Sequence, residues 1–185
     1  MSRSRAPNLS SRSAKFACHL GAALAAISIS LPAWADGASV GGHIGVATPF
    51  VTVSKKTTTI SDQFTLLTPI GVTVKPGGKL VVDFEVVVAN PVSPPGKTGL
   101  VIDPGIVYDW GGVATGLRIA FETNADTNVG LIPLINFGLA NLGGATWFIE
   151  AAFPTFVHSR PDDPPATGHH AEVAFNAVLH TGIGF

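Results

Sequence analysis

The last fourteen residues of the chain, 172–185, constrain the fold more than any other stretch. Large apolar residues alternate there with small or polar ones, which is the period of a β-strand. One face carries Val173, Phe175, Ala177, Leu179, Ile183 and Phe185, and the other carries Ala174, Asn176, His180, Gly182 and Gly184. A soluble protein buries the apolar face of such a strand, whereas a transmembrane barrel turns it towards lipid. About 9–11 residues of this pattern suffice to cross a bilayer.

The beginning of the chain has the features of an export signal. Four basic residues precede an apolar run over 16–31, and Ala33-Trp34-Ala35 follows as a small-residue cleavage site. This apolar run is too short to span a membrane as a helix. We therefore expect residues 1–35 to be a cleaved secretory signal peptide and residues 36–185 to form one exported domain.

Charge and cysteine content exclude several classes of protein. Residues 1–35 contain four of the eleven basic residues, so seven remain against all twelve acidic residues, a net charge near −5. An acidic chain of this kind offers no basic surface for nucleic acid. The single cysteine, Cys18, lies within the predicted signal, so we expect neither a disulfide nor a lipid anchor in the mature chain.

Two kinds of connection alternate between eight segments of strand character. The segments are approximately 43–54, 63–75, 79–90, 98–110, 113–123, 129–140, 146–158 and 172–185. Every second connection contains a Gly-Gly pair, at positions 77–78, 111–112 and 143–144, which predicts tight hairpin turns. The other connections are longer and polar. Short turns at one end and long loops at the other are typical of transmembrane β-barrels.

Charged residues within these segments are confined to one face. Asp83 and Glu85 alternate with large apolar residues, and Arg118 and Glu150 do the same in their own segments. A charge facing lipid at the middle of a bilayer costs about 2–4 kcal/mol for a base and less for an acid. This one-sidedness therefore favours a barrel with an apolar outer surface.

Five prolines argue against regular pairing. They stand near the middles of five segments, at Pro49, Pro69, Pro104, Pro133 and Pro154. Proline cannot donate a ladder hydrogen bond, and a closed barrel has no edge strand to hold it. We expect a bulge or a local kink at each of them.

The terminal strand, the alternating connections and the even strand count together resemble the small bacterial outer-membrane barrels of the OmpA and OmpX type. The resemblance covers the architecture of residues 36–185 and includes no shared motif. It implies an all-β, closed up-and-down antiparallel barrel of eight strands that spans the outer membrane. It also implies outer-membrane lipid and the barrel assembly machinery as partners, the latter through the strand ending in Phe185.

The inward face of such a barrel would gather the polar side chains. We expect a salt-bridged lumen in which Arg118 pairs with Glu85 or Glu150. The predicted lumen cluster is Asp83, Glu85, Asp103, Arg118, Glu122, Glu150, Asn176 and His180. Near the turns, Tyr108, Trp110, Trp147 and Phe185 predict a periplasmic aromatic girdle.

Nothing in the chain predicts an enzyme, a cofactor or a metal site. His158 and Ser159 are adjacent on a strand and so point to opposite faces, which prevents a nucleophile–base pair. Asp162-Asp163 and His169-His170, in the longest loop, are a weak metal signal without residues that fix their geometry. The Gly-Gly pairs are turns and not nucleotide loops.

Three functions stay open at this point. The first is a structural or surface-interaction barrel with a sealed, salt-bridged lumen. The second is a narrow cation-preferring channel or transporter component, which requires the cluster of Glu85, Arg118 and Glu150 to open. The third is a soluble periplasmic barrel of lipocalin type, in which the large apolar residues would line a lipid pocket and the acids would face water.

Overall fold

The computed structural model describes residues 37–123, 128–161 and 169–185, of which 159–161 and 169–170 are described by their backbone alone. No helix in this described part is long and apolar enough to cross a membrane. The predicted signal peptide, 1–35, lies outside it. The strands are β1 (Ser39–Val53), β2 (Thr57–Thr59), β3 (Phe64–Lys75), β4 (Leu80–Ser93), β5 (Gly99–Asp109), β6 (Val113–Glu122), β7 (Asn128–Asn141), β8 (Thr146–Ala152), β9 (Thr155–Pro161) and β10 (His169–Gly184).

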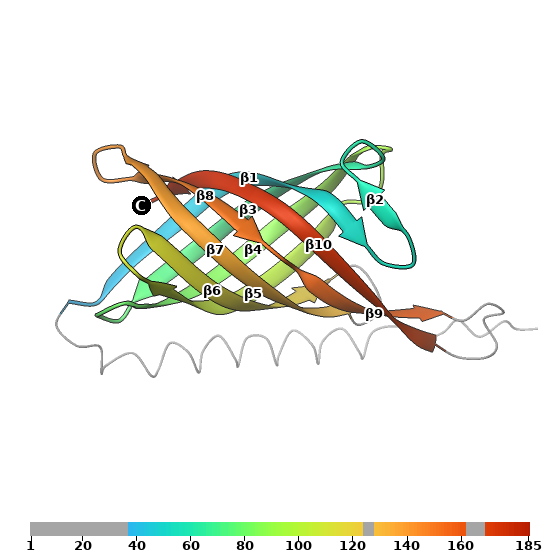
Figure 1. Ribbon diagram of the computed structural model, residues 1–185. Coiled ribbons are helices and arrows are strands. Elements are labelled where there is room, and N and C mark those ends of the chain that lie inside the picture. Colours follow the sequence, from blue (N-terminus) through green and yellow to red (C-terminus); the bar gives the residue numbers. More distant parts are fainter. Residues whose placement is uncertain (1–36, 124–127, 162–168) are drawn as a thin grey trace, which may run out of the picture. The chain divides into compact units, whose positions relative to one another are not determined.

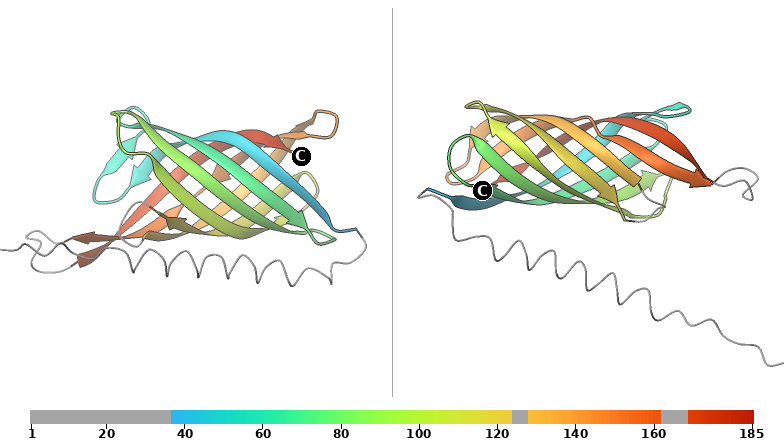
Figure 2. Two further views of the ribbon diagram at one scale, coloured as in Figure 1. Left: turned by 180° about the vertical axis from the view of Figure 1, so that it is seen from behind. Right: turned by 90° about the horizontal axis from the view of Figure 1, so that it is seen from below.

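The strands close into one antiparallel barrel, shown in Figures 1 and 2. β1 pairs with β3, the strands from β3 to β8 each pair with the next one in sequence, and β10 returns to pair with β1. β8 and β9 both pair with β7 and β10, so together they form one wall position. The short β2 pairs only with β1, in a segment predicted to be loop. The predicted all-β, closed eight-stranded antiparallel barrel is therefore confirmed.

The three Gly-Gly pairs form the connections at one end of the barrel, which we call the turn end. All six glycines have positive φ angles, from 75° at Gly78 to 117° at Gly77. The predicted tight turns are therefore confirmed, since most other residues avoid such angles. The described domain starts at this end and Phe185 also lies there (Figure 1). The opposite end, with the longer connections, is the loop end.

The prolines disturb the barrel less than expected. The register of β1 against β10 shifts between Pro49 and Val51, and β8 ends just before Pro154. Pro69, Pro104 and Pro133, however, lie opposite partners in unshifted ladders, so of the expected bulge or local kink the bulge is absent at these three. A strand residue directs its N–H and C=O to the same neighbour, so proline removes one hydrogen bond and leaves the register intact.

The large apolar residues of the strands point outward. Along β4, the exposed Leu80, Val82 and Phe84 alternate with the buried Asp83 and Glu85. On β5 and β6, Ile106 and Leu117 are likewise exposed. The lipocalin-like alternative required the opposite orientation, with these residues lining a pocket, and does not fit this barrel.

The interior is not polar throughout. On its loop-end side lies an apolar layer, to which every wall strand contributes. Its members are Ala47, Leu67, Val87, Val101, Ala120, Ile132, Leu134, Ala152, Phe156 and Val178, all buried or partly buried. Five of them occupy the next inward position on the loop side of a polar residue: Val87 after Glu85, Val101 beyond Asp103, Ala120 after Arg118, Ala152 after Glu150 and Val178 beyond His180. At these five positions an apolar residue thus follows a polar one towards the loop end, although the buried Val81 and Phe148 lie on the turn-end side with the polar network.

Candidate functional site: a buried polar network

Arg118 is the centre of the polar network, where it contacts three carboxylates. Its Nη2 and Nε lie 2.7 Å and 2.9 Å from Oδ2 of Asp83. Its Nη1 lies 3.2 Å from Glu150 and 3.4 Å from Glu85. Arg118 thus pairs with both Glu85 and Glu150, either of which was predicted, but its two shortest contacts are with Asp83.

The strand register explains this partner. Asp83 of β4 lies opposite Gly105 of β5, and Gly105 lies opposite Arg118 of β6. A Cβ atom at Gly105 would lie 2.5 Å from Cγ of Arg118. The missing side chain therefore leaves the space through which Arg118 reaches Asp83 over the intervening strand.

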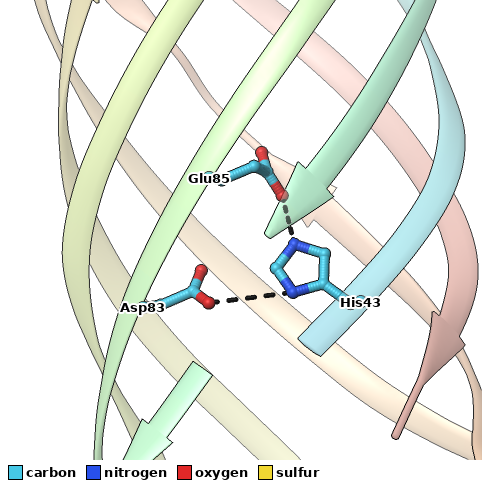
Figure 3. A group of neighbouring side chains, drawn as sticks. All are labelled: His43, Asp83 and Glu85. Atoms are coloured by element: carbon cyan, nitrogen blue, oxygen red, sulfur yellow. Dashed lines mark hydrogen bonds and ion pairs between the residues drawn. The ribbon is translucent and has the colours of Figure 1, made fainter. Parts of the chain in front are cut away.

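His43 repeats this arrangement on the other side of β4. Glu85 lies opposite Gly71 of β3, which lies opposite His43 of β1. The imidazole occupies the space that a Cβ atom of Gly71 would take. Its Nε2 lies 2.6 Å from Oε2 of Glu85, and its Nδ1 lies 3.7 Å from Oδ1 of Asp83, as Figure 3 shows. His43 was not predicted to be part of the cluster, although it starts the first predicted strand segment.

Glu150 completes the network on β8. Its neighbours on β7 and β10 are Asn136 and His180, each directly opposite it in the ladder. Asn136 donates to Oε2 at 3.2 Å, and Nδ1 of His180 lies 3.5 Å from Oε1. The carboxylate of Glu150 thus has three partners, namely Asn136, His180 and Arg118.

Asp103 differs from the other acids in the interior. It lies directly opposite Glu85, faces inward and is 1% exposed. Its Oδ1 has no hydrogen-bond partner within the described part of the chain. A buried carboxylate without a partner is costly, and one guanidinium serves the four interior acids Asp83, Glu85, Asp103 and Glu150.

Two members of the predicted cluster lie elsewhere. Glu122 accepts a hydrogen bond from Asn128, its cross-strand partner at the loop end. Asn176 accepts one from Thr52 at 2.6 Å. Followed from the turn end, β6 and β10 pass the apolar layer at Ala120 and Val178 before they reach Glu122 and Asn176. The polar residues of the interior therefore form a main network and separate pairs at the loop end.

A cavity of about 620 Å³ leads from the turn end to the network. His43, Asp83, Arg118, Asn136 and Glu150 line its inner end, and Val107, which packs against the apolar layer, also lines the cavity. The network is therefore reachable from the turn end, while the apolar layer lies between it and the loop end.

The four aromatic residues predicted near the turns all lie there and are exposed. Trp110 and Trp147 each donate an indole hydrogen bond to a threonine of the neighbouring strand, at 3.0 Å and 2.9 Å. The rings of Tyr108 and Trp110 lie 4.5 Å apart. Phe185 pairs its backbone with Gly42 through two hydrogen bonds, and its ring lies beside Gly42.

The weak metal signal of the longest loop falls largely on residues outside the described part of the chain. Asp162 and Asp163 lie outside the described residues. His169 and His170 pair with β9 through their backbones, but their side chains are also outside the described part.

Outside the strands, Asp62 follows β2 and closes a small turn. The backbone N–H and the hydroxyl of Thr59 donate to its carboxylate at 2.8 Å and 2.7 Å. These hydrogen bonds hold the pKa of Asp62 below its ordinary value.

Comparisons with known proteins give no relative: no family model, curated protein or solved structure matches the chain. The fold and the interior therefore define it by class alone. It is a closed eight-stranded antiparallel barrel with a buried, salt-bridged polar network.

Proposed function

We propose that this protein is an integral outer-membrane β-barrel with a structural or surface-interaction role. The observation that carries the proposal is the outer surface of the strands. Large apolar residues are exposed on it all around the barrel, for example Ile44, Phe84, Ile106, Leu131 and Val173. Water would solvate such a surface poorly, whereas the hydrocarbon of a bilayer matches it.

The charges of the wall strands support the same proposal. Asp83, Glu85, Asp103, Arg118 and Glu150 are all buried in the interior. The exposed lysines, Lys55, Lys56, Lys75, Lys79 and Lys97, lie at strand ends or in connections. Among the described side chains, the outer surface between the two ends thus carries no charge, as the hydrocarbon region requires. The exposed Tyr108, Trp110, Trp147 and Phe185 at the turn end would form the periplasmic aromatic girdle.

The proposed role is non-enzymatic and non-conducting. The interior acids are engaged mainly with Arg118 and the two histidines, and the apolar layer crosses the lumen beyond them. An eight-stranded barrel is narrow enough for side chains to fill it. The proposed partners are outer-membrane lipid and the barrel assembly machinery, with no nucleic acid and no cofactor.

Fractionation of a Gram-negative host that expresses the full chain tests this proposal. We expect the protein in the outer membrane, with residues 1–35 removed, resistant to carbonate extraction and with heat-modifiable gel mobility. Release by the carbonate wash would reject the membrane assignment. Depth-dependent quenching of Trp110 and Trp147 by brominated lipids would then locate the proposed girdle, which should lie near the headgroups.

The channel alternative draws support from the turn-end cavity, which brings solvent to an acidic network. Conduction would also require a path through the apolar layer. We expect planar bilayers to show no steady ohmic current with the wild-type barrel. Currents that change on Arg118→Ala would favour the channel and reject the sealed interior.

A further inference from the structure

The main network contains more acidic than basic side chains. Asp83, Glu85, Asp103 and Glu150 are all at most 3% exposed, and Arg118 is the one guanidinium that the described structure places among them. Asp103, whose Oδ1 has no hydrogen-bond partner in the described part of the chain, lies opposite Glu85. Buried carboxyl groups with an unsatisfied oxygen are a favourable setting for a bound cation.

The geometry around His43 provides a place for one. Ligand atoms of His43, Asp83 and Glu85 all lie within 4.8 Å of one another, and all three residues are buried. In Figure 3 the two carboxylates approach the two nitrogens of the ring from different sides. The turn-end cavity is lined by His43 and Asp83, so an ion from solution could reach them.

The two contacts of the ring differ in length, which assigns them different roles. The gap of 3.7 Å between Nδ1 and Oδ1 of Asp83 suits an ion, because two ligands each about 2.0–2.2 Å from zinc are roughly 3–4 Å apart. The 2.6 Å contact between Nε2 and Glu85 is too short to admit an ion and is a hydrogen bond. A carboxylate on the second ring nitrogen is the usual device that orients a metal-binding histidine.

The other oxygen of Asp83 is already engaged. Arg118 binds Oδ2 through two nitrogens, so Oδ1 is the atom turned towards His43, where Thr73 also donates to it at 3.0 Å. Gly71 gives the imidazole its place. Arg118 and Thr73 thus hold the carboxylate of Asp83 in position, and the space beside Gly71 accommodates the ring of His43.

We propose that this cluster is a divalent transition-metal site. His43 Nδ1 and Asp83 Oδ1 bind the ion directly, Glu85 orients the imidazole, and water from the cavity fills the remaining positions. An imidazole together with carboxylates suits zinc, cobalt or nickel better than calcium or magnesium, which prefer oxygen ligands alone. The site lies inside the barrel and does not depend on what surrounds its outer surface.

Equilibrium dialysis of the folded, metal-free protein against Zn²⁺, followed by metal analysis, tests the proposal. We expect one Zn²⁺ per chain, undiminished by an excess of Ca²⁺ or Mg²⁺. With Co²⁺ as the probe, X-ray absorption should report one imidazole among nitrogen and oxygen ligands. Failure of the wild-type protein to retain Zn²⁺, or a bound ion without an imidazole ligand, would overturn the proposal.

Variants then locate the ion. His43→Gln should lower the affinity for Zn²⁺ at least ~100-fold, and Glu85→Gln, which replaces the carboxylate that orients His43, about 10–100-fold. His180→Gln is the matched control, since it removes another buried imidazole beside the same network, and should retain wild-type affinity. Wild-type affinity in His43→Gln, or loss of binding on replacing His169 and His170 instead, would reject this site.

A further variant leaves His43, Asp83 and Glu85 unchanged, so that the test does not depend on whether the variants of these residues fold. Gly71→Ala places a methyl group where the ring of His43 lies and should weaken Zn²⁺ binding. Gly138→Ala, on the cavity wall, would have its nearest neighbour at 3.5 Å from the new Cβ atom and should bind normally. Circular dichroism and heat-modifiable mobility confirm folding in each case. Equal Zn²⁺ affinity of the two folded glycine variants would contradict the role of His43.

Discussion

At the scale of single residues, the interior depends on where side chains are absent. Gly105 and Gly71 lie between pairs of polar residues two strands apart, and the intervening backbone carries nothing that would separate them. The paired residues are Asp83 with Arg118 and Glu85 with His43. We therefore expect the network to require a glycine on the strand between each pair of interacting residues.

Gly105→Ala tests this requirement. The new Cβ atom would approach backbone atoms, with the carbonyl oxygen of Leu117 at 2.5 Å and Cα of Arg118 at 2.7 Å, so a side-chain movement alone cannot relieve the contact. We expect the free energy of unfolding to decrease by about 1–3 kcal/mol, the usual cost of overpacking. Urea titration of the refolded barrel measures it. Gly138→Ala is the control, and equal stability of the two variants would show that Gly105 is not needed.

Arg118→Met tests the network itself. The change leaves Asp83, Glu85 and Glu150 buried without their shared cation. Removal of one partner from a buried ion pair costs about 3–5 kcal/mol, whereas the exposed Lys97→Met should change stability by less than about 0.5 kcal/mol. Adding Asp83→Asn to Arg118→Met should cost less than the two single changes together. Strict additivity would mean that the two groups are not coupled.

At the scale of elements, the tight turns fix one end of the barrel and the loops leave the other end variable. Every second connection is a Gly-Gly turn with positive φ angles, and these turns set the register of β3 with β4 and of β5 with β6, whereas that of β7 with β8 shifts between Gly138 and Ala140. The register across the longer connections is not set by any local feature of comparable strength. The sequence therefore predicts strand pairs better than it predicts how those pairs are aligned with each other.

Gly77→Ala measures what one turn contributes. The φ angle of 117° at this position is outside the range that alanine adopts without strain, although the space around it is open. We expect a loss of about 1–3 kcal/mol in the free energy of unfolding. The comparison is Gly184→Ala, in β10, where a Cβ atom would make only ordinary contacts. A cost no larger than that of Gly184→Ala would mean that the turn tolerates a side chain.

At the scale of the whole molecule, the barrel separates its surfaces by chemistry. The outside carries large apolar residues, the turn-end half of the inside carries charges and a cavity, and the apolar layer follows towards the loop end. A soluble domain of this length would place its apolar residues inside. The arrangement instead supports our proposal of a membrane barrel, and its interior contains ion pairs.

The last residue provides a test of assembly in the cell. The side chain of Phe185 is 68% exposed and its backbone pairs with Gly42, so Phe185→Ala should hardly alter the stability of the refolded barrel. For an outer-membrane barrel the terminal aromatic residue belongs to the signal read by the assembly machinery. We therefore expect a lower outer-membrane yield for Phe185→Ala and for deletion of Phe185. Phe175→Ala, an exposed position on the same strand, should keep its yield, and equal yields in all three would reject this role.

The sequence by itself determined the number of wall strands, the three turns and the face on which each charge lies. Those features depend on residues close together in the chain: alternation with period two, and Gly-Gly pairs that only one kind of turn accommodates. The proline expectation was too severe at Pro69, Pro104 and Pro133, because one missing hydrogen bond does not shift a ladder held on both sides.

Only the tertiary structure decided which inward groups meet. The residues 94–98 that connect β4 to β5 leave their register free in the sequence, and that register is what places Asp83, through Gly105, in line with Arg118. Closure of β10 onto β1 likewise brings His180 near His43, whose ring centroids lie 6.1 Å apart. Shifting a strand by two residues would keep every face correct and still change every partner. The pattern thus fixes the face of each residue, while closure of the barrel fixes its height.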